Sequence, residues 1–315
     1  MSKLPWPRVA VLGAGAVGCY FGGMLARAGA PVTLIGRPAH VEAFRRDGLL
    51  METLTFTEHV PVAASTEPAA VAGAEVVLVC VKSGDTESVA RKMAPHLAPD
   101  AVVVSLQNGV DNAARMRPLL ENEVIAAVVY VGCQMNGPGH VQHLGRGDLI
   151  VGGRAGSAES AARAARVAAL FERAGVPCRV SPNIDGDLWA KLIVNAAYNA
   201  VCALSRLPYG AMIASPWSRE VMPQVVEEAV AVARADGVRL DADGMLERMW
   251  KIGEAMPAQI SSTAQDIALG KPTEIDALNG YVVRRGAALG VPTPVNRTLH
   301  ALVKLLEQAT ARPAR

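Results

Sequence analysis

A lysine and two asparagines recur at four-residue intervals in an otherwise apolar stretch. The stretch is WAKLIVNAAYNA, and its polar residues are Lys191, Asn195 and Asn199. In a helix with 3.6 residues per turn, these positions form one ridge about 12 Å long. A solvated ridge more often carries Glu, Lys and Arg than asparagine, a poor helix former. The pattern therefore favours a ridge that lines a wet cleft, where amides bind a small polar ligand; a solvent-exposed face is the alternative.

A second group of hydroxyl and carboxyl side chains lies in ISSTAQDIALGKPTEIDALNGY, which includes Ser262 and Glu274. Such groups bind polar substrates and move protons, so both residues are candidates for a functional site. The same letters also fit two helix starts. Ser262-x-x-Gln265 is a capping box, and Thr273 followed by Glu274 and Asp276 is a typical acidic helix start. The pattern alone leaves both interpretations open.

A glycine-rich turn near the start of the chain predicts a dinucleotide-binding site. The sequence RVAVLGAGAVG indicates a strand at Val9–Leu12, then Gly13-x-Gly15-x-x-Gly18 entering a helix, and the next strand follows at Val32–Ile35. The three glycines suit a tight turn, close approach of the backbone to a pyrophosphate, and close helix–strand packing. The free N–H groups at the helix start would face the phosphates.

The same segment has a competing interpretation. The uncharged run from Val9 to Ala26 resembles a signal peptide or a membrane span by its length. Five glycines lie within this run and would weaken a spanning helix. A strand, a turn and a helix are therefore favoured.

The residue that follows the second strand bears on the choice of cofactor. NAD-binding versions of this unit usually carry Asp or Glu there, which bonds the ribose 2′-hydroxyl. Here the chain has Ile35-Gly36-Arg37, with a cation and no acid. A guanidinium grips a 2′-phosphate with two parallel hydrogen bonds, so NADPH is favoured over NADH. A solvated loop arginine ahead of Pro38 is the alternative.

Two further polar residues follow predicted buried strands. Lys82 ends the stretch AEVVLVCVK, and Asn108 ends AVVVSLQN. The carboxyl ends of strands in a doubly wound sheet form the ligand crevice, so both are candidates for contact with cofactor or substrate. Turn residues occur at the same places, and Asn-Gly is a common turn pair. Position favours a functional role for Asn108 and leaves Lys82 open.

The order of the elements predicts two domains, at residues 1–182 and 183–315. The first is expected to be an α/β domain with a Rossmann-type doubly wound sheet, whose edge is closed by antiparallel strands in 125–153. Strand signals nearly vanish after residue 183, so the second domain is expected to be all-helical. Its helices are predicted at 184–204, 216–236, 241–253, 261–269, 273–289 and 294–309.

Charge, cysteine and histidine content argue against several functions. The net charge is +2 without a dense Lys/Arg cluster, so we expect no nucleic-acid partner and no membrane partner. The five cysteines are scattered without a CxxC pair, which favours reduced thiols and a cytoplasmic location. His140 and His143 have metal-ligand spacing but no partner cluster, so we expect no metal.

Taken together, these motifs resemble the ketopantoate reductase (2-dehydropantoate 2-reductase) family over essentially the whole chain. The resemblance rests on GAGAVG, on Asn108-Gly109 after a strand, and on KLIVNAAYN, SSTAQD, TEIDALNGYVV and LGVPTPVN in this order. It implies a Rossmann domain followed by a helical domain of the 6-phosphogluconate dehydrogenase C-terminal-like type. It also implies NADPH-dependent reduction of ketopantoate to (R)-pantoate, in pantothenate and coenzyme A biosynthesis.

The resemblance also implies roles for particular residues. Lys191 corresponds to the general acid, and Glu274 is catalytic beside substrate and cofactor. An ammonium at the ketone oxygen stabilises the growing negative charge there and donates the proton. The implied substrate-binding residues are Asn108, Asn195, Asn199 and Ser262. The implied cofactor-binding residues are Gly13, Ala14, Gly15, Ala16, Val17, Gly18, Arg37, Lys82, Asn108, Cys133 and Glu274.

The sequence departs from the family pattern at two positions that bear on the substrate pocket. Tyr209 stands where several members have a substrate-contacting asparagine, and Thr263 stands where methionine is common. Two alternatives therefore stay open: reduction of another branched or aromatic 2-oxo acid, and a non-enzymatic NADP(H)-sensing protein. A β-hydroxyacid dehydrogenase is a more distant alternative that leaves TEID and SSTAQD unexplained. The expected partner is a small 2-oxo acid, and a homodimer is left open.

Overall fold

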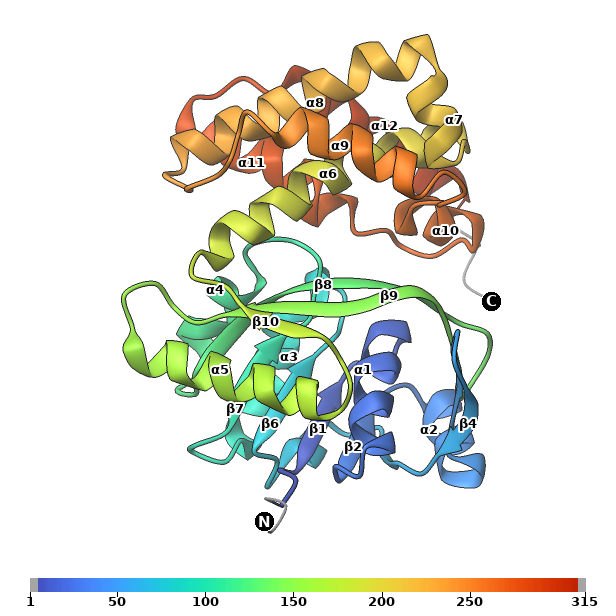
Figure 1. The fold of residues 1–315 in the computed structure, drawn as a ribbon, viewed down its shortest axis with the longest axis vertical. Helices are drawn as coiled ribbons and strands as arrows, with labels where there is room; N and C mark the ends of the chain where they lie inside the picture. The colour runs from blue at the N-terminus through green and yellow to red at the C-terminus, as the bar shows by residue number, and fades with distance from the viewer. Residues whose placement is uncertain (1–4, 311–315) are drawn as a thin grey trace. The chain divides into compact units, whose positions relative to one another are not determined.

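The computed structural model describes residues 5–310, and their contacts divide the chain into two compact units (Figure 1). The first unit consists of Met1–Gln107 and Asp111–Ile184, and the second, the helical unit, consists of Asn108–Val110 and Asp185–Arg315. The unit changes between Ile184 and Asp185, whereas the sequence-based boundary at 182/183 stays a prediction. The outermost residues of both predicted domains, 1–4 and 311–315, lie outside the described part of the chain.

The first unit is built on a ten-stranded mixed sheet whose central part is doubly wound. Six strands pair with one another in parallel in the order β5-β2-β1-β6-β7-β8. They are β1 Val9–Leu12, β2 Val32–Ile35, β5 Ala63–Ser65, β6 Val76–Val79, β7 Val102–Ser105 and β8 Val124–Met135. The strand order reverses between β1 and β6, and such switch points bind ligands at the carboxyl ends of the strands. The predicted Rossmann-type fold is confirmed.

Beyond β8 the sheet continues further than the sequence predicted. β9 His140–Gly152 lies in the predicted antiparallel region, and β10 Cys178–Val180 agrees with the short strand that the sequence indicates at 177–180. The strands β3 Leu49–Glu52 and β4 Thr57–Val60 were not predicted. β9 pairs antiparallel with β8, as expected, but the prediction that this pair closes the sheet edge is wrong. Both β3 and β10 pair with β9, and β4 is the outer strand. β3 (LLME) and β4 (TEHV) are as long as β1 but carry charged residues and no continuous apolar run, so their sequences give no clear strand signal.

Helices cover the sheet and supply the rest of the first unit's core. They are α1 Ala16–Arg27, α2 Pro38–Asp47, α3 Thr86–Met93, α4 Asn112–Met116 and α5 Ala158–Arg173. Short 3₁₀ turns are η1 Pro68–Val71, η2 Ser83–Asp85, η3 Ala94–His96 and η4 Arg117–Leu119. The strands β1 and β6 are buried along their whole length, as continuous apolar central strands should be. The uncharged run from Val9 thus forms a strand, a turn and a helix, as predicted, and α1 buries Phe21 and Leu25 against the sheet.

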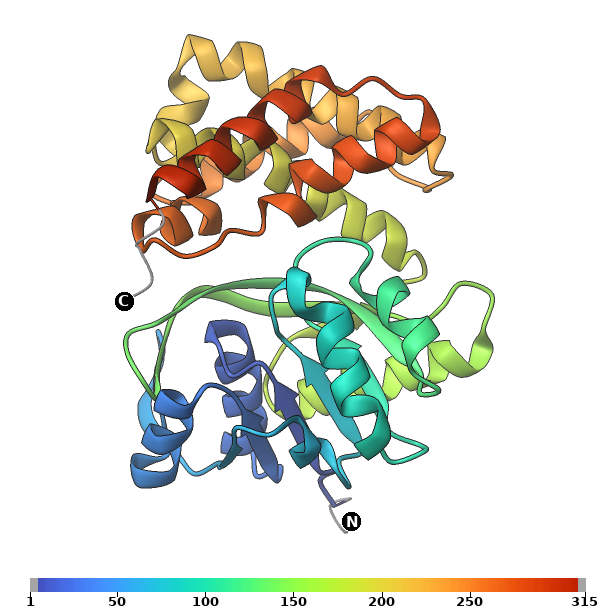
Figure 2. The ribbon, with the colours of Figure 1, turned by 180° about the vertical axis from the view of Figure 1, so that it is seen from behind.

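The helical unit has its own core around one central helix. Its elements are α6 Ile184–Ser205, α7 Tyr209–Ala214, α8 Pro216–Ala235, α9 Met245–Ala255, α10 Ser262–Ala268, η5 Ile275–Ala277, α11 Asn279–Leu289 and α12 Pro294–Thr310. Figure 2 shows α11 and α12, coloured orange to red, side by side, and they pack on each other and on α8. The α6 residues Ile193, Ala197 and Tyr198 are completely buried in this core.

Three details of the helical unit differ from the predictions. The short helix α7 was not predicted, and α9 begins at Met245 rather than at 241. The predicted helix 273–289 is two separate elements, η5 and α11, because Leu278 between them has non-helical dihedral angles (φ −105°, ψ −105°). Glu274 therefore lies in an irregular segment rather than in the first turn of an α-helix.

Within residues 5–310, α6 is the single helix long and apolar enough to cross a membrane by composition. The window that meets this criterion is 72% buried inside the protein. It packs against the other core residues of the helical unit. A buried core helix meets the same criterion, and the contacts of α6 are those of a core helix.

Candidate functional site

Three polar side chains of the helical unit form a continuous line of hydrogen bonds. The ammonium of Lys191 on α6 donates to Asn108 Oδ1 at 3.0 Å. Asn108 Nδ2 in turn donates to Glu274 Oε2 at 2.9 Å. All three residues are half-buried. Because the ammonium occupies the acceptor end of the amide and the carboxylate its donor end, the Asn108 side chain is fixed in one orientation. The line links residues 83 and 166 positions apart in the chain.

The other two residues of the α6 ridge have different environments. Asn199 is 3% exposed and its Nδ2 lies 3.5 Å from Ser262 Oγ, at the limit of a hydrogen bond. Asn195, between Lys191 and Asn199, is half-buried. Among residues 5–310 the Asn195 amide has no hydrogen-bond partner. A half-buried amide with unused donors and an unused acceptor is suited to a polar ligand.

The start of α10 explains why Ser262 faces Asn199. Ser261 is the N-cap of α10, and its hydroxyl accepts from Ala264 N at 3.2 Å. The Ser261 hydroxyl also lies within donating distance of the Asn199 carbonyl, at 3.4 Å, and Ser261 N donates to Cys202 Sγ at 3.3 Å. Both bonds anchor the start of α10 on α6. The alternative interpretation of Ser262 as the helix cap is wrong, since the N-cap is Ser261, and Ser262 is an exposed residue.

The glycine-rich turn of the first unit has room for a phosphate group. Gly13 has φ +109°, and a Cβ there would lie 2.7 Å from the backbone of Cys80, so a side chain does not fit. At Gly15, by contrast, a Cβ would meet nothing within 4 Å, so the protein itself leaves the space beside this residue open. No side chain caps α1 and its first turn has no acid. The N–H groups of that turn lack intrahelical partners, which suits a pyrophosphate.

Arg37 lies at the carboxyl end of β2, next to this turn. The backbone N–H groups of Gly13 and Ala14 donate to the Ile35 carbonyl, which ties the turn to the end of β2. Arg37 is exposed and precedes α2 as its N-cap residue. Its guanidinium has no hydrogen-bond or ion-pair partner in the part of the chain that the structure describes. An exposed, unpaired cation at this strand end suits a 2′-phosphate.

Two other predicted cofactor residues lie after β6 and on β8, which flank β7 in the sheet. Lys82 is exposed and precedes η2, just after β6. Cys133 is half-buried in the second half of β8, opposite His143 of β9. Burial raises the pKa of the Cys133 thiol to about 12, so the thiol stays neutral near pH 7 and is a poor nucleophile.

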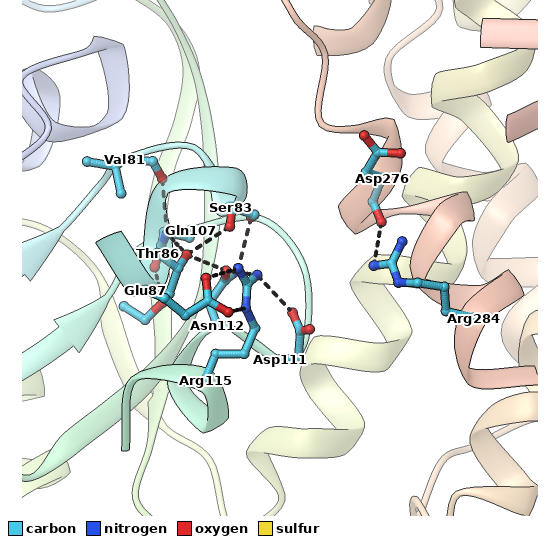
Figure 3. Close-up of polar contacts among 11 residues, drawn as sticks. Val81, Ser83, Thr86, Glu87, Gln107, Asp111, Asn112, Arg115, Asp276 and Arg284 are labelled. Atoms are coloured by element: carbon cyan, nitrogen blue, oxygen red, sulfur yellow. Dashed lines mark hydrogen bonds and ion pairs between the residues drawn. The ribbon is translucent and has the colours of Figure 1, made fainter. Parts of the chain in front are cut away.

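Sequence reasoning missed a buried polar network at the ends of β6 and β7 (Figure 3). Gln107, 5% exposed, accepts from Ser105 Oγ at 2.9 Å. Its Nε2 donates to the Val81 carbonyl at 3.1 Å and to Thr86 Oγ1 at 2.8 Å. The Thr86 hydroxyl donates to Asn112 Oδ1 at 2.9 Å. The network fixes the loop after β6 to the loop after β7.

This network supports candidates from both loops. Val81 immediately precedes Lys82, and Gln107 immediately precedes Asn108. One signal in the sequence was available: the amide of Gln107 follows a buried apolar run and directly adjoins a predicted site residue. A buried amide must be hydrogen-bonded, but the sequence does not say to what.

Comparisons with known proteins agree over nearly the whole chain. A family model described as ketopantoate reductase PanE/ApbA matches residues 9–156, and a model of its C-terminal part matches residues 183–307. The 2-dehydropantoate 2-reductase of Halobacterium salinarum is 37% identical over 308 residues, which cover 96% of this chain and 99% of that protein.

Two solved structures have nearly the same fold. A PanE/ApbA family ketopantoate reductase from Ralstonia eutropha JMP134 has a TM-score of 0.91 and 55% identity, covering 96% of this chain and 99% of that one. D-mandelate dehydrogenase with NADH and anilino(oxo)acetate has a TM-score of 0.90 over 96% of this chain and 99% of that one. At 24% identity, this second likeness concerns the fold alone.

Proposed function

Because this chain belongs to the ketopantoate reductase family, we propose that it reduces 2-dehydropantoate (ketopantoate) to (R)-pantoate with NADPH. It is an NADP-dependent oxidoreductase. The reaction would serve pantothenate and coenzyme A biosynthesis. The observation that carries the proposal is the line of hydrogen bonds from Lys191 through Asn108 to Glu274.

Lys191 is the general acid in this proposal. When bound, the nicotinamide ring supplies a hydride to the carbonyl carbon of the 2-oxo acid. Negative charge then grows on the ketone oxygen, where the Lys191 ammonium stabilises it and transfers a proton from Nζ to that oxygen. Asn108 supports this role because its amide oxygen accepts from the ammonium and restricts where it points.

Substrate binding is proposed for the remaining polar residues of the ridge and its neighbours. Asn195 supports this most directly, since its half-buried amide has no partner in residues 5–310. The amide of Asn199 on α6 and the hydroxyl of Ser262 on α10 lie next to each other. Together with Asn108 they would hold the carboxylate and hydroxyl of the substrate for a near-attack geometry. Glu274 would accept from the substrate hydroxyl or steady Lys191 through Asn108.

We propose the preference for NADPH over NADH on the basis of residues in the first unit. Arg37 would bind the 2′-phosphate, and the glycine-rich turn with Ala14, Ala16 and Val17 would bind the pyrophosphate. Lys82, Cys133, Asn108 and Glu274 are the further cofactor contacts that we propose. All five cysteines are free thiols in the structure, which supports a cytoplasmic location.

No observation favours an enlarged pocket for aromatic substrates. The ring of Tyr209 stacks on Tyr198, with 4.1 Å between centroids, in the core of the helical unit. Thr263 is also buried, at 2% exposure. These two departures from the family pattern therefore belong to core packing rather than to a surface that a ligand reaches directly.

The test is NADPH oxidation with ketopantoate beside pyruvate, 2-oxoisovalerate and phenylglyoxylate. We expect ketopantoate to have the highest kcat/KM of the four. A preference for phenylglyoxylate or 2-oxoisovalerate would contradict the proposed substrate and favour the related 2-oxo acid reductase. NADPH binding without turnover of any keto acid would favour the sensing protein. Light scattering of the purified protein tests the homodimer, which stays a prediction.

A further inference from the structure

The segment that carries Glu274 has no regular secondary structure of its own. It connects α10 to the 3₁₀ turn η5, and Glu274 has φ −102° and ψ 21°. Irregular segments are usually more mobile than the helices that they connect. The Glu274 carboxylate nevertheless lies 2.9 Å from Asn108 Nδ2. Contacts on either side of Glu274 must therefore restrain the segment.

The residue before Glu274 is held by α12. Glu307 Oε1 accepts two hydrogen bonds from Thr273, from its backbone N–H at 2.7 Å and from its hydroxyl at 2.5 Å. The Thr273 hydroxyl also accepts from Ile275 N at 3.2 Å. Glu307 has a side chain only 14% exposed, and its other oxygen lies 2.6 Å from Lys304 Nζ. A carboxylate that accepts from a backbone N–H and an ammonium together makes strong, charge-assisted bonds.

The residue two positions after Glu274 is held as well. Asp276 Oδ1 lies 2.7 Å from His300 Nε2, and Oδ2 lies 3.0 Å from Lys304 Nζ, both on α12. The Asp276 carbonyl accepts from Arg284 Nη2 on α11 at 2.9 Å, as Figure 3 shows. Lys304 thus pairs with both carboxylates: that of Glu307, which holds Thr273 before Glu274, and that of Asp276 after it. We call Thr273, Asp276, His300, Lys304 and Glu307 the Glu274 clamp.

We propose that the Glu274 clamp, with Glu307 as its main member, is a positioning device that holds the Glu274 carboxylate against Asn108. This inference rests on the proposed role of Glu274 in the reduction. Its physical basis is that Thr273 is covalently adjacent to Glu274, so releasing Thr273 frees the backbone that aims the carboxylate. A misplacement of about 1 Å in a catalytic group costs up to about 100-fold in rate.

The first experiment compares Glu307→Ala and Glu307→Gln with an exposed control in the full-length enzyme. Glu307→Ala removes the oxygen that accepts both hydrogen bonds from Thr273, and we expect kcat to fall roughly ten-fold or more while KM for NADPH changes much less than kcat. Glu307→Gln keeps one oxygen that can accept from Thr273, so it should recover most of kcat. The control is Asp243→Ala, which removes an exposed ion pair with Arg234 elsewhere in the helical unit and should leave kcat unchanged. Equal kcat in Glu307→Ala and the control would overturn the inference.

A double-mutant cycle with Glu274→Gln separates positioning from a merely structural role. If Glu307 acts through Glu274, adding Glu307→Ala to Glu274→Gln should lower kcat no further. Losses that multiply would overturn the inference, since Glu307 would then act independently of Glu274. A Glu274→Gln enzyme with full turnover would instead contradict the proposed catalytic role of Glu274 itself. Thermal unfolding of each variant shows whether a loss of kcat comes from loss of the folded protein.

Discussion

Lys191 donates a hydrogen bond to a neutral amide oxygen, and such a partner suits a proton donor. A hydrogen bond to a neutral acceptor is weaker than one to an anion. An oxygen that gains negative charge during a reaction therefore competes well for the same ammonium. The interaction with Lys191 would strengthen as the charge grows, which is the condition for accelerating a chemical step rather than only binding the substrate.

Replacing Lys191 by alanine tests this role. Without the ammonium, nothing at that position stabilises the charge or supplies the proton, so kcat should fall by about 10²- to 10⁴-fold. NADPH binding should survive, because the glycine-rich turn is unchanged. Steady-state kinetics and a fluorescence titration with NADPH measure the two effects. Lys251→Ala, which removes an exposed lysine paired with Glu247, is the control. A fully active Lys191→Ala enzyme would refute the assignment.

Replacing Arg37 by glutamate tests the preference for NADPH. Loss of charge-assisted hydrogen bonds to a 2′-phosphate, and repulsion by the new carboxylate, should raise KM for NADPH by roughly 10- to 100-fold. KM for the keto acid should change much less. The matched control is Arg46→Glu at the other end of α2, where the arginine pairs with Asp47 on the surface. If both Michaelis constants shift equally in Arg37→Glu, Arg37 does not bind the phosphate.

Spacing in the sequence predicted which residue types share a ridge but not which partners they meet. Lys191, Asn195 and Asn199 are placed on one face by helical periodicity alone. The contact of Lys191 with Asn108 joins positions 83 residues apart, and periodicity within one helix contains nothing about such pairs. The choice between Ser261 and Ser262 as a helix cap depends on the backbone angles of a single residue, which neighbouring serines do not determine.

Polar networks of neighbouring elements fasten the segments that carry Asn108 and Glu274. Gln107, Thr86 and Asn112 do this in the first unit, and α12 does it in the helical unit through Glu307 and Lys304. Buried and half-buried hydrogen bonds suit this purpose because leaving one partner unpaired is costly. Sequence patterns predicted the central apolar strands and the long helices, whose patterns are strong. They did not predict the break at Leu278, whose dihedral angles are non-helical.

The stabilisation that the Glu274 clamp gives to the helical unit should be lost in acid. Burial works to raise the pKa of Asp276, but hydrogen bonds from His300 and Lys304 outweigh it and lower that pKa. The pKa of Glu307 is also lowered, since hydrogen bonds from Lys304 and Thr273 outweigh its burial. Because both pKa values are lower in the folded state, the stabilisation is present above the unfolded-state values of about 4. It should be lost as the pH falls through the folded-state values.

Urea unfolding measured between pH 6 and pH 2 checks this expectation. The free energy of unfolding should fall with decreasing pH, and Glu307→Gln should make that fall smaller. Glu220→Gln, at an exposed position of α8, is the control and should leave the slope unchanged. In alkali the dependence on pH is the opposite. Burial works to lower the pKa of Lys304, but its bonds to Glu307 and Asp276 raise that pKa. The stability that Lys304 contributes is therefore lost only as the pH rises through the higher, folded-state pKa. An identical acid slope in wild type and Glu307→Gln would contradict the expectation.

At the scale of the whole molecule, two separate cores correspond to two kinds of sequence pattern. Short continuous apolar runs separated by glycines predicted the parallel strands, and longer runs of helical period predicted the helical unit. The extension of the sheet by β3 and β4 was not predictable in the same way. β3 is stabilised by pairing with β9, whose residues lie about 90 positions away, and by bonds such as that of His140 to Glu52. β4 then pairs with β3 alone.

The two cores also predict how the protein unfolds. Buried residues of the first unit and of the helical unit form separate clusters, so we expect two calorimetric transitions rather than one. Leu25→Ala and Met222→Ala each remove a fully buried side chain, one from each core. Each substitution should lower the free energy of unfolding of its own unit by about 2–5 kcal/mol. NADPH at 100 times its Kd should raise the free energy of unfolding of the first unit by about 2.7 kcal/mol, since the glycine-rich turn that we propose for phosphate binding lies in that unit. A single transition that both substitutions lower equally would show that the cores unfold together.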